Sequence, residues 1–349
     1  MLDNNDFPLV SVVITGKNEQ NTIEKCIVSI LNQSYPNFEI IYVDAKSSDN
    51  TIKKANQLKS LLNSIKKCKR YLTVSLEADF PSKGRNLGVN NANGSIIAFT
   101  DADCVADQDW LTNLVRHLSK GIGIVGGPNI IRHFKNSRIT DAIDSVLSTY
   151  LGSGGSPQFY KIHENCDVYA LPSCNMAIQK NLFEKVGEFN EKLRYNEDSD
   201  LCNRIRKSGS RILYTPSARI YHFIGIESYN QFISYFHRYG YERGKNAATN
   251  LDFFTKFNAL SLSIIVAALS LLSFSFFISM AFTIFILLIT IVISIVFFVS
   301  LKIGIRNRSP MSFFLVLMIF PSLHIVYNSG FVFGYLIGIK KSRLILNDY

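Results

Sequence analysis

Two long stretches without a charged residue constrain this chain more than any other feature of its sequence. Residues 257–301 contain no Asp, Glu, Lys or Arg over 45 positions, and residues 309–339 contain none over 31. Because one membrane-spanning helix needs about 20 apolar residues, the first stretch predicts two spans joined by a tight turn near 279–283. The second predicts either one span or a re-entrant hairpin, since a proline, a histidine, an asparagine and three glycines interrupt its apolar run.

The chain before residue 257 has a different composition. Charged residues are frequent there and apolar residues come in short runs, which is typical of a globular domain in contact with water. We therefore predict a globular domain over residues 1–250 and a membrane region over residues 251–349. The predicted hydrophobic segments cover about 258–277, 281–301 and 311–339.

The distribution of positive charge predicts which side of the membrane the globular domain occupies. The net charge is +10, and residues 257–349 contribute six basic side chains and one acidic one, or +5. Basic residues beside spans mark the cytoplasmic side, so the clusters at 302–308 and 340–343 and the globular domain should all be cytoplasmic. That arrangement needs an even number of crossings, which favours a re-entrant third segment. We expect no nucleic-acid partner, because half of the positive charge lies beside the spans.

Several common sequence signals are absent. Residues 1–8 are acidic and have no apolar core, so we expect no signal peptide there. The six cysteines include no C-x-x-C pair, which predicts reduced, structural cysteines in a cytoplasmic domain. No G-x-G-x-x-G follows the first apolar run and no P-loop motif occurs, which argues against a dinucleotide cofactor and excludes a P-loop.

Short apolar runs alternate with helical patterns through the first hundred residues. The runs at 10–15, 38–43, 71–76 and 95–100 predict strands, and helical spacing begins at Asn21, at Thr51 and at Lys83. Such alternation predicts an α/β fold, a mostly parallel sheet with helices on both faces. Ligands bind such sheets at the carboxyl ends of the strands.

Acidic residues follow two of the predicted strands. Asp44 ends the second strand, where its carboxylate could accept hydrogen bonds from a base or a ribose. We expect Asp49 to cap the next helix instead. Asp101 and Asp103 follow the fourth strand and project to the same side if the chain is extended. Two neighbouring carboxylates repel each other, so a hard cation such as Mg²⁺ or Mn²⁺ between them and a phosphate is a natural partner.

A third acidic group opens a predicted helix near residue 200. Glu197, Asp198 and Asp200 lie within four positions. Acids in a first helical turn complement the helix dipole, but three exceed what capping needs. One of them is a candidate general base, which must reach the proton it removes.

These residues fall into six motifs that together resemble the family 2 glycosyltransferases of the GT-A fold. The motifs occur in the family's order over residues 10–210, about two thirds of the chain. They are S-V-V-I at 11–14 with Asn18-Glu19, S-I-L-N-Q-S-Y-P at 29–36, V-D-A-K-S-S-D-N-T at 43–51, G-R-N-L-G at 84–88, F-T-D-A-D at 99–103 and E-D-S-D-L at 197–201.

The resemblance implies a role for each matching residue. Asp44 would bind the nucleobase, Arg85 the pyrophosphate or sugar, and Asp101 the ribose or sugar. Asp103 would hold the metal, and Asp198, within the acidic pair it forms with Glu197, would be the catalytic base. The roles imply direct displacement at the anomeric carbon with inversion, the metal stabilising the departing nucleoside diphosphate.

Two further residues are candidates for the same site. His222 lies where related enzymes often place a histidine near the metal, although a buried, hydrogen-bonded histidine fits equally well. Residues 171–178 resemble the segment that lines the donor sugar site. Within it we expect a site role for Asn175 and structural roles for Cys174 and Met176.

The sequence departs from the family pattern in places that bear on substrate. Thr15-Gly16-Lys17 and Ala45-Lys46 replace commoner sequences near the expected nucleotide site, which leaves base preference open. The Q-x-x-R-W motif of processive synthases is absent, which favours transfer of a single sugar. Aromatic residues near the membrane region would hold a lipid-linked acceptor at the interface or simply pack against the membrane helices. They are Phe232, Tyr235, Phe236, Tyr239 and Tyr241.

Three functions compete on this reading. The leading one is an inverting, metal-dependent, non-processive enzyme of the cell membrane that moves a sugar from a nucleotide-sugar donor to a membrane-associated, lipid-linked glycan. Its pathway would be cell-surface polysaccharide or glycoconjugate synthesis, with membrane lipid as a further partner. A polyprenyl-phosphate glycosyl synthase would share the motifs. A catalytically inactive nucleotide-binding scaffold protein is disfavoured, because it has no chemical need for Asp44, Asp101, Asp103 and Asp198 together.

Overall fold

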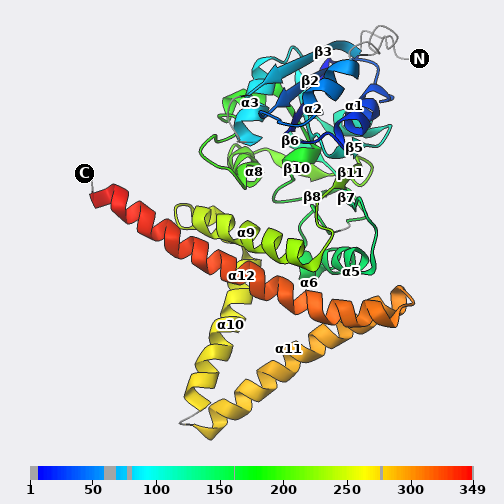
Figure 1. Cartoon of the computed structure of the whole chain (residues 1–349). Coiled ribbons are helices and arrows are strands. Elements are labelled where there is room, and N and C mark those ends of the chain that lie inside the picture. The colour runs from blue at the N-terminus through cyan, green and yellow to red at the C-terminus, as the bar shows by residue number, and fades with distance from the viewer. Residues whose placement is uncertain (1–6, 59–67, 77–80, 161, 276–277, 348–349) are drawn as a thin grey trace. The chain divides into compact units, whose positions relative to one another are not determined.

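The computed structural model describes residues 7–58, 68–76, 81–160, 162–275 and 278–347. The chain forms two compact units (Figure 1). The sheet unit comprises Met1–Arg132 and Ser156–Ile224, and the helical unit comprises His133–Gly155 and Gly225–Tyr349. The helical unit thus includes residues 133–155 and 225–250 as well as the predicted membrane region, and the domain boundary at residue 250 stays a prediction.

The sheet unit is built on an eight-stranded mixed sheet with strand order β3-β2-β1-β4-β9-β6-β10-β8, beside a three-stranded sheet of order β5-β11-β7. The strands are β1 Val10–Gly16, β2 Phe38–Asp44, β3 Cys68–Ser75, β4 Ile96–Asp101, β5 Cys104–Ala106, β6 Ile122–Gly126, β7 Asn129–Arg132, β8 Cys166–Asp167, β9 Met176–Gln179, β10 Arg211–Tyr214 and β11 Ile220–Phe223. The helices are α1 Ile23–Leu31, α2 Thr51–Gln57, α3 Pro81–Asn90, α4 Trp110–His117, the 3₁₀ turn η2 Ser173–Asn175, α7 Lys180–Lys185 and α8 Glu197–Lys207.

The first four strands confirm the predicted parallel order, since β3, β2, β1 and β4 run side by side and parallel. β1, β2 and β4 are almost fully buried because both faces of the sheet are covered there, whereas β3, at the edge of the sheet, is only partly buried. In β1, Val12 and Ile14 belong to the core on one face, and Val13 belongs to the core on the other. The apolar face of α1 completes the first of these cores.

Parallel pairing brings the carboxyl ends of three strands to one edge. Asp44 of β2 pairs with Gly16, and Asp101 of β4 pairs with Thr15, so both acids flank the end of β1. Asp49 Oδ1 accepts the backbone N–H of Thr51, the first residue of α2, although the N-cap position itself is occupied by Asn50. The expected edge of the sheet therefore carries two of the predicted site residues.

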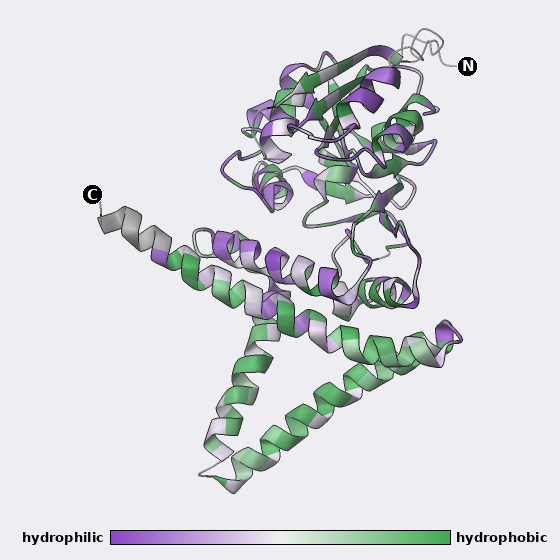
Figure 2. Ribbon diagram, viewed as in Figure 1, coloured by the Kyte–Doolittle hydropathy of each residue, from purple (hydrophilic) through white to green (hydrophobic). Residues whose placement is uncertain are grey.

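The helical unit contains α5 Arg138–Leu147, α6 Tyr150–Ser153, α9 Tyr229–Ala247, the 3₁₀ turn η3 Leu251–Phe253, α10 Lys256–Ser275, α11 Ser279–Arg306 and α12 Pro310–Asn347. Figure 2 shows hydrophobic residues over most of α10, α11 and α12, whereas α9 is largely hydrophilic. Three of these helices are long and apolar enough to cross a membrane: Asn258–Ser275, Ser279–Arg306 and Pro310–Lys340.

One detail of this region differs from the prediction. The expected turn at 279–283 is wrong, because α10 ends at Ser275 and α11 already begins at Ser279. Of the two alternatives for the third segment, a single helix or a hairpin, the structure has one continuous helix, which contains Pro321. A proline costs a helix one hydrogen bond but need not end it, since neighbouring helices can support the backbone.

The aromatic residues of α9 pack against α12 over the part of the chain that the structure describes. Phe232 and Phe236 are buried. The rings of Tyr239 and Tyr327 are 6.0 Å apart, and those of Tyr241 and Phe333 are 5.8 Å apart. Of the two roles expected for these residues, the contacts support packing.

Candidate active site

Arg85 joins two of the predicted acidic motifs. From α3, its Nη2 donates to Asp101 Oδ1 and its Nη1 to Glu197 Oε1, both at 2.8 Å. The guanidinium is buried, and its Nε has no hydrogen-bond partner among the described residues. Burial raises the pKa of Glu197 to about 7 despite the charge of Arg85. Arg85 therefore ties β4 to the start of α8.

Asp103 and His222 form a second pair at the same edge. His222 Nε2 lies 3.1 Å from Asp103 Oδ2, although the two residues are 119 positions apart in the chain. Burial disfavours the charged imidazole, but the neighbouring Asp103 raises the pKa of His222 overall, and the histidine in turn lowers the pKa of Asp103. The two carboxylates of the D-x-D motif thus have different partners, Asp101 an arginine and Asp103 a histidine.

Glu19 is a further acid of the site that the sequence did not single out. Burial, together with the charges of Asp103 and Asp101, raises its pKa to about 7. The charges of Asp103, Asp101 and His222 all act on Glu19, so the three carboxylates lie in the same part of the site. Carboxylate oxygens and an imidazole nitrogen are ligands that suit Mg²⁺ or Mn²⁺. Asp103, with His222 and Glu19 beside it, would hold such an ion. The signal available in the sequence was the position of Glu19 in the loop after the first strand.

Asp44 is fully buried at the end of β2, and its carboxylate organises the following loop. Its Oδ1 accepts from the Tyr42 hydroxyl at 2.8 Å and from Ser47 Oγ at 2.6 Å, and its Oδ2 accepts from the Ser47 backbone N–H at 2.8 Å. These bonds hold the loop expected to receive a nucleobase. Direct contact between Asp44 and the base stays a prediction.

Asp198 and Asn175 differ in how their polar atoms are used. Asp198 is half-buried in the first turn of α8, and its Oδ1 accepts the Ser199 backbone N–H at 2.6 Å. Asn175 is fully buried, with its Oδ1 accepting from Trp110 Nε1 and its Nδ2 donating to the carbonyls of Pro128 and Ala218. These contacts favour a structural role for Asn175, and its contact with the donor stays a prediction.

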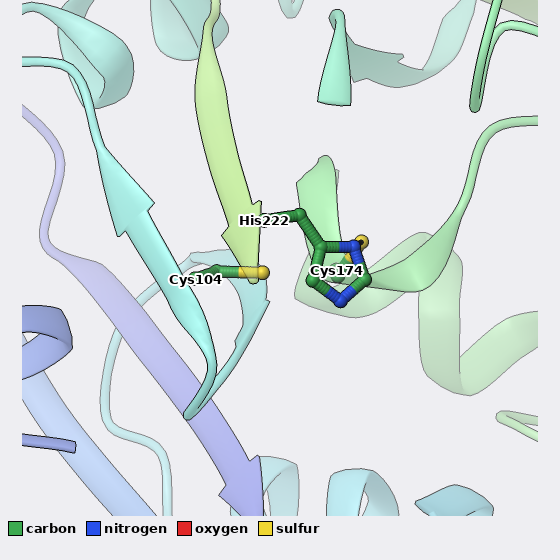
Figure 3. Close-up of side chains that lie close together, drawn as sticks. All are labelled: Cys104, Cys174 and His222. Carbon is green, nitrogen blue, oxygen red and sulfur yellow. Dashed lines mark hydrogen bonds between the residues drawn. The ribbon is translucent and has the colours of Figure 1, made fainter. Parts of the chain in front are cut away.

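Two thiols lie beside the imidazole of His222. Cys104 and Cys174 are buried, and their sulfur atoms and a ring nitrogen of His222 all lie within 4.8 Å of one another (Figure 3). Hydrogen bonding to Cys104 and the nearby His222 lower the pKa of Cys174 to about 7, whereas burial raises the pKa of Cys104. Sequence analysis predicted a structural role for Cys174 and did not connect it with Cys104, because the spacing of the two cysteines matches no metal motif.

The fold and this edge of the sheet define a class of protein. A mostly parallel sheet that carries a D-x-D pair at its carboxyl edge is the arrangement of the GT-A glycosyltransferases. Residues 11–187, half of the chain, match the model of the family described as glycosyl transferase family 2, and the protein belongs to that family. It is therefore a glycosyltransferase.

Relatives and solved structures agree with this assignment. The chain is 26% identical to glycosyltransferase AglE of Haloferax volcanii over 60% of its own length and 64% of that protein, so it spans less than two thirds of this relative. It is 25% identical, over 94% of its length and 98% of the relative, to a Methanococcus voltae dolichyl N-acetyl-alpha-D-glucosaminyl phosphate 3-beta-D-2,3-diacetamido-2,3-dideoxy-beta-D-glucuronosyltransferase. Its fold is similar to that of the mannosyltransferase PcManGT of Pyrobaculum calidifontis, solved with GDP-Man and Mn²⁺. That match has a TM-score of 0.60 and 17% identity, and covers 90% of this chain and 86% of that one.

Proposed function

We propose that this protein is an inverting, metal-dependent, non-processive glycosyltransferase that moves one sugar from a nucleotide-sugar donor to a lipid-linked glycan. The observation that carries the proposal is the convergence of Asp101, Asp103 and Glu19 with Arg85 and His222 at the carboxyl edge of the sheet. Asp101 and Asp103 each have a basic partner, but their charges still raise the pKa of Glu19, so a divalent cation would be stabilised in this group.

The donor is held by charge and by the loop after β2. A divalent ion bound by Asp103 and His222 would stabilise the negative charge that develops on the leaving diphosphate. Arg85 adds a second positive charge, which would attract the diphosphate. Asp44 fixes the loop through Ser47, which shapes the place of the base.

Asp198 is the proposed catalytic base. Its carboxylate accepts the proton of the acceptor hydroxyl as that oxygen forms a bond to the anomeric carbon, and the bond from that carbon to the diphosphate oxygen breaks. Attack opposite the leaving group inverts the anomeric configuration. Glu197 is less suited to this role because Arg85 holds its carboxylate, so we assign it to positioning.

The lipid-linked acceptor is supported by two findings. Three helices of the chain are long and apolar enough to cross a membrane. The Methanococcus voltae relative, which matches over nearly its full length, is named for an acceptor carried on dolichyl phosphate. A membrane-held enzyme and a membrane-held acceptor meet in two dimensions, which raises their effective concentration.

The experiment measures nucleoside diphosphate release by membranes containing the protein, with Mn²⁺ or Mg²⁺ and a panel of nucleotide sugars. Asp103→Asn and Asp198→Asn should each lower turnover by about 10²–10⁴-fold, whereas Asp167→Asn, on the exposed edge strand β8, should not. Asp198→Asn should still bind donor in calorimetry, because only the base is lost. Undiminished turnover in both site variants would refute the assignment.

The acceptor is tested in the same assay. A panel of polyprenyl phosphate, polyprenyl-linked sugars and water-soluble sugars should give product only with the polyprenyl-linked sugars, one residue being added per acceptor. Product from free polyprenyl phosphate would identify the enzyme as a polyprenyl-phosphate glycosyl synthase instead. Donor binding without turnover on any acceptor would favour an inactive scaffold protein.

A further inference from the structure

We propose that Cys104, Cys174 and His222 form a site for a thiophilic metal ion such as Zn²⁺, next to the site of the hard cation. Cys104 of β5 lies directly opposite His222 of β11 in the antiparallel pairing, and Cys174 lies on η2. The three ligand atoms lie within 4.8 Å of one another (Figure 3). Two thiolates and an imidazole are a ligand set of zinc sites with an open fourth position.

The imidazole of His222 faces two different sets of ligands. Its Nδ1 lies 3.9 Å from Cys174 Sγ, and its Nε2 lies 3.1 Å from Asp103 Oδ2. Metal-bound histidines commonly donate their second ring N–H to a carboxylate, which fixes the ring. With a thiophilic ion on Nδ1, Asp103 is positioned to be that carboxylate.

A neutral imidazole has one free ring lone pair, so it cannot serve both metals. Binding of a thiophilic ion forms two metal–sulfur bonds and one metal–Nδ1 bond, and both thiol protons and any proton on Nδ1 pass to solvent. Nε2 then carries the single ring proton toward Asp103, so it cannot ligate the hard cation. This consequence rests on the proposed function, and it makes Zn²⁺ an antagonist of Mn²⁺ or Mg²⁺ at this edge.

The test of the site needs no donor and no turnover. The full-length protein in detergent is titrated with Co²⁺, whose thiolate charge-transfer absorption reports sulfur ligation, and then with Zn²⁺. We expect the band to saturate at one Co²⁺ per chain and to disappear on addition of Zn²⁺. Cys104→Ser and Cys174→Ser should each abolish or strongly weaken it, whereas Cys166→Ser, a cysteine outside the cluster, should leave it unchanged.

Folding of each variant is checked by the emission of Trp110, the single tryptophan. No thiolate band in the folded wild-type protein, or an equal band in folded Cys174→Ser, would overturn the site. The antagonism is measured separately, as a Zn²⁺-dependent decrease in apparent Mn²⁺ affinity that the Cys174→Ser variant loses. If the Co²⁺ thiolate band appears but Zn²⁺ leaves the Mn²⁺ affinity unchanged, the thiophilic site is supported. Only the role of His222 in binding the hard cation is then refuted.

From an independent observation we infer that α12 does not cross the bilayer but lies along the interface beside α9. Contacts between the two helices repeat with a constant sequence offset over sixteen residues. Tyr229 bonds to Ser322 at 2.7 Å, and a Cβ at Gly330, Gly334 or Gly338 would meet the carbonyl oxygen of His237, Tyr241 or Lys245. The offset is 93 each time: 322 − 229, 330 − 237, 334 − 241 and 338 − 245. The helices therefore run parallel over about 24 Å.

The composition of α9 decides where this pair can lie. Arg238, Glu242, Arg243 and Lys245 all belong to α9, and a charged side chain at the centre of a bilayer costs roughly 2.5–3.5 kcal/mol or more. Since α9 stays in the polar region, residues 322–338 of α12 stay there with it. Only α10 and α11 then cross, which places the basic clusters at 302–308 and 340–343 on the same side as the globular domain.

Reporter fusions test this topology. Green fluorescent protein, which fluoresces in the cytoplasm, and alkaline phosphatase, which is active outside it, are fused after Ile278, after Arg308 and after Tyr349. We expect phosphatase activity after Ile278 and fluorescence after Arg308 and Tyr349. Phosphatase activity after Tyr349, with fluorescence after Arg308, would show that α12 crosses. Fluorescence at all three positions would show that neither α10 nor α11 does.

Discussion

The sheet unit and the helical unit are each stabilised internally, but by different kinds of packing. In the sheet unit large side chains fill the core: the rings of Phe99, Phe183 and Phe189 lie 5.2–5.6 Å apart. Between α9 and α12 the backbones themselves meet. A Cβ added at Gly244 would lie 2.0 Å from the carbonyl oxygen of Phe331.

The difference follows from the residues at each contact. Burying apolar area contributes roughly 25 cal/mol per Å², so large side chains stabilise the sheet unit. Between α9 and α12, glycines remove the side chains that would separate the helices, and close packing of the two backbones provides the stabilisation. Packing in the sheet core should therefore be sensitive to loss of side-chain volume, and packing between α9 and α12 should be sensitive to gain of side-chain volume.

Loss of a ring from the sheet core should have the largest effect. Phe99→Ala removes a fully buried ring that contacts two others, and we expect it to lower the free energy of unfolding by about 3–5 kcal/mol. Urea unfolding followed by Trp110 emission measures this. Phe99→Leu, which keeps most of the volume, should cost less, and equal costs would show that volume is not what matters here.

Gain of volume between α9 and α12 should come next. Gly244→Val forces the helices apart, at a cost of about 1–3 kcal/mol, and should speed trypsin cleavage at Arg238, Arg243 or Lys245 in detergent. Gly225→Ala is the matched control in the same unit, because a Cβ there would meet nothing within 4 Å. Unchanged protection in Gly244→Val would contradict the close approach of the backbones.

The pH dependence should be the smallest effect, and it belongs to the sheet unit. The folded-state pKa of Glu19 is raised to about 7, so the folded protein binds more protons than the unfolded chain between about pH 4.3 and 7. Without divalent ions, stability should therefore fall as pH rises through this range. Glu19→Gln should flatten the fall, as measured by urea midpoints from Trp110 emission, and an unchanged slope would show that Glu19 is not responsible.

Local patterns predicted the sheet unit well. Strands β1, β2 and β4 are buried and mostly apolar, and their parallel pairing brings Asp44 and Asp101 to the predicted edge. Local patterns could not predict which side chains distant in sequence contact one another. The pairs Asp103–His222 and Arg85–Glu197 join motifs more than a hundred residues apart, and the proximity of Cys104 to Cys174 depends on the same folding.

The helical unit was harder to predict for a physical reason. The glycines of α12 looked like interruptions of an apolar span, because a glycine has no side chain from which a partner can be inferred. Only the register with α9 shows that they allow contact. The location of the turn between α10 and α11 was missed because the whole stretch is uniformly apolar and carries no local stop signal.

The register between α9 and α12 also has a consequence for biosynthesis. The ribosome completes α9 before α10 and α11 exist, and Ser322, the partner of Tyr229, follows 93 residues later. Until then the glycine-lined face of α9 has no α12 to cover it. The α10–α11 hairpin therefore has time to insert first, and docking of α12 onto α9 would be the last step that completes the helical unit.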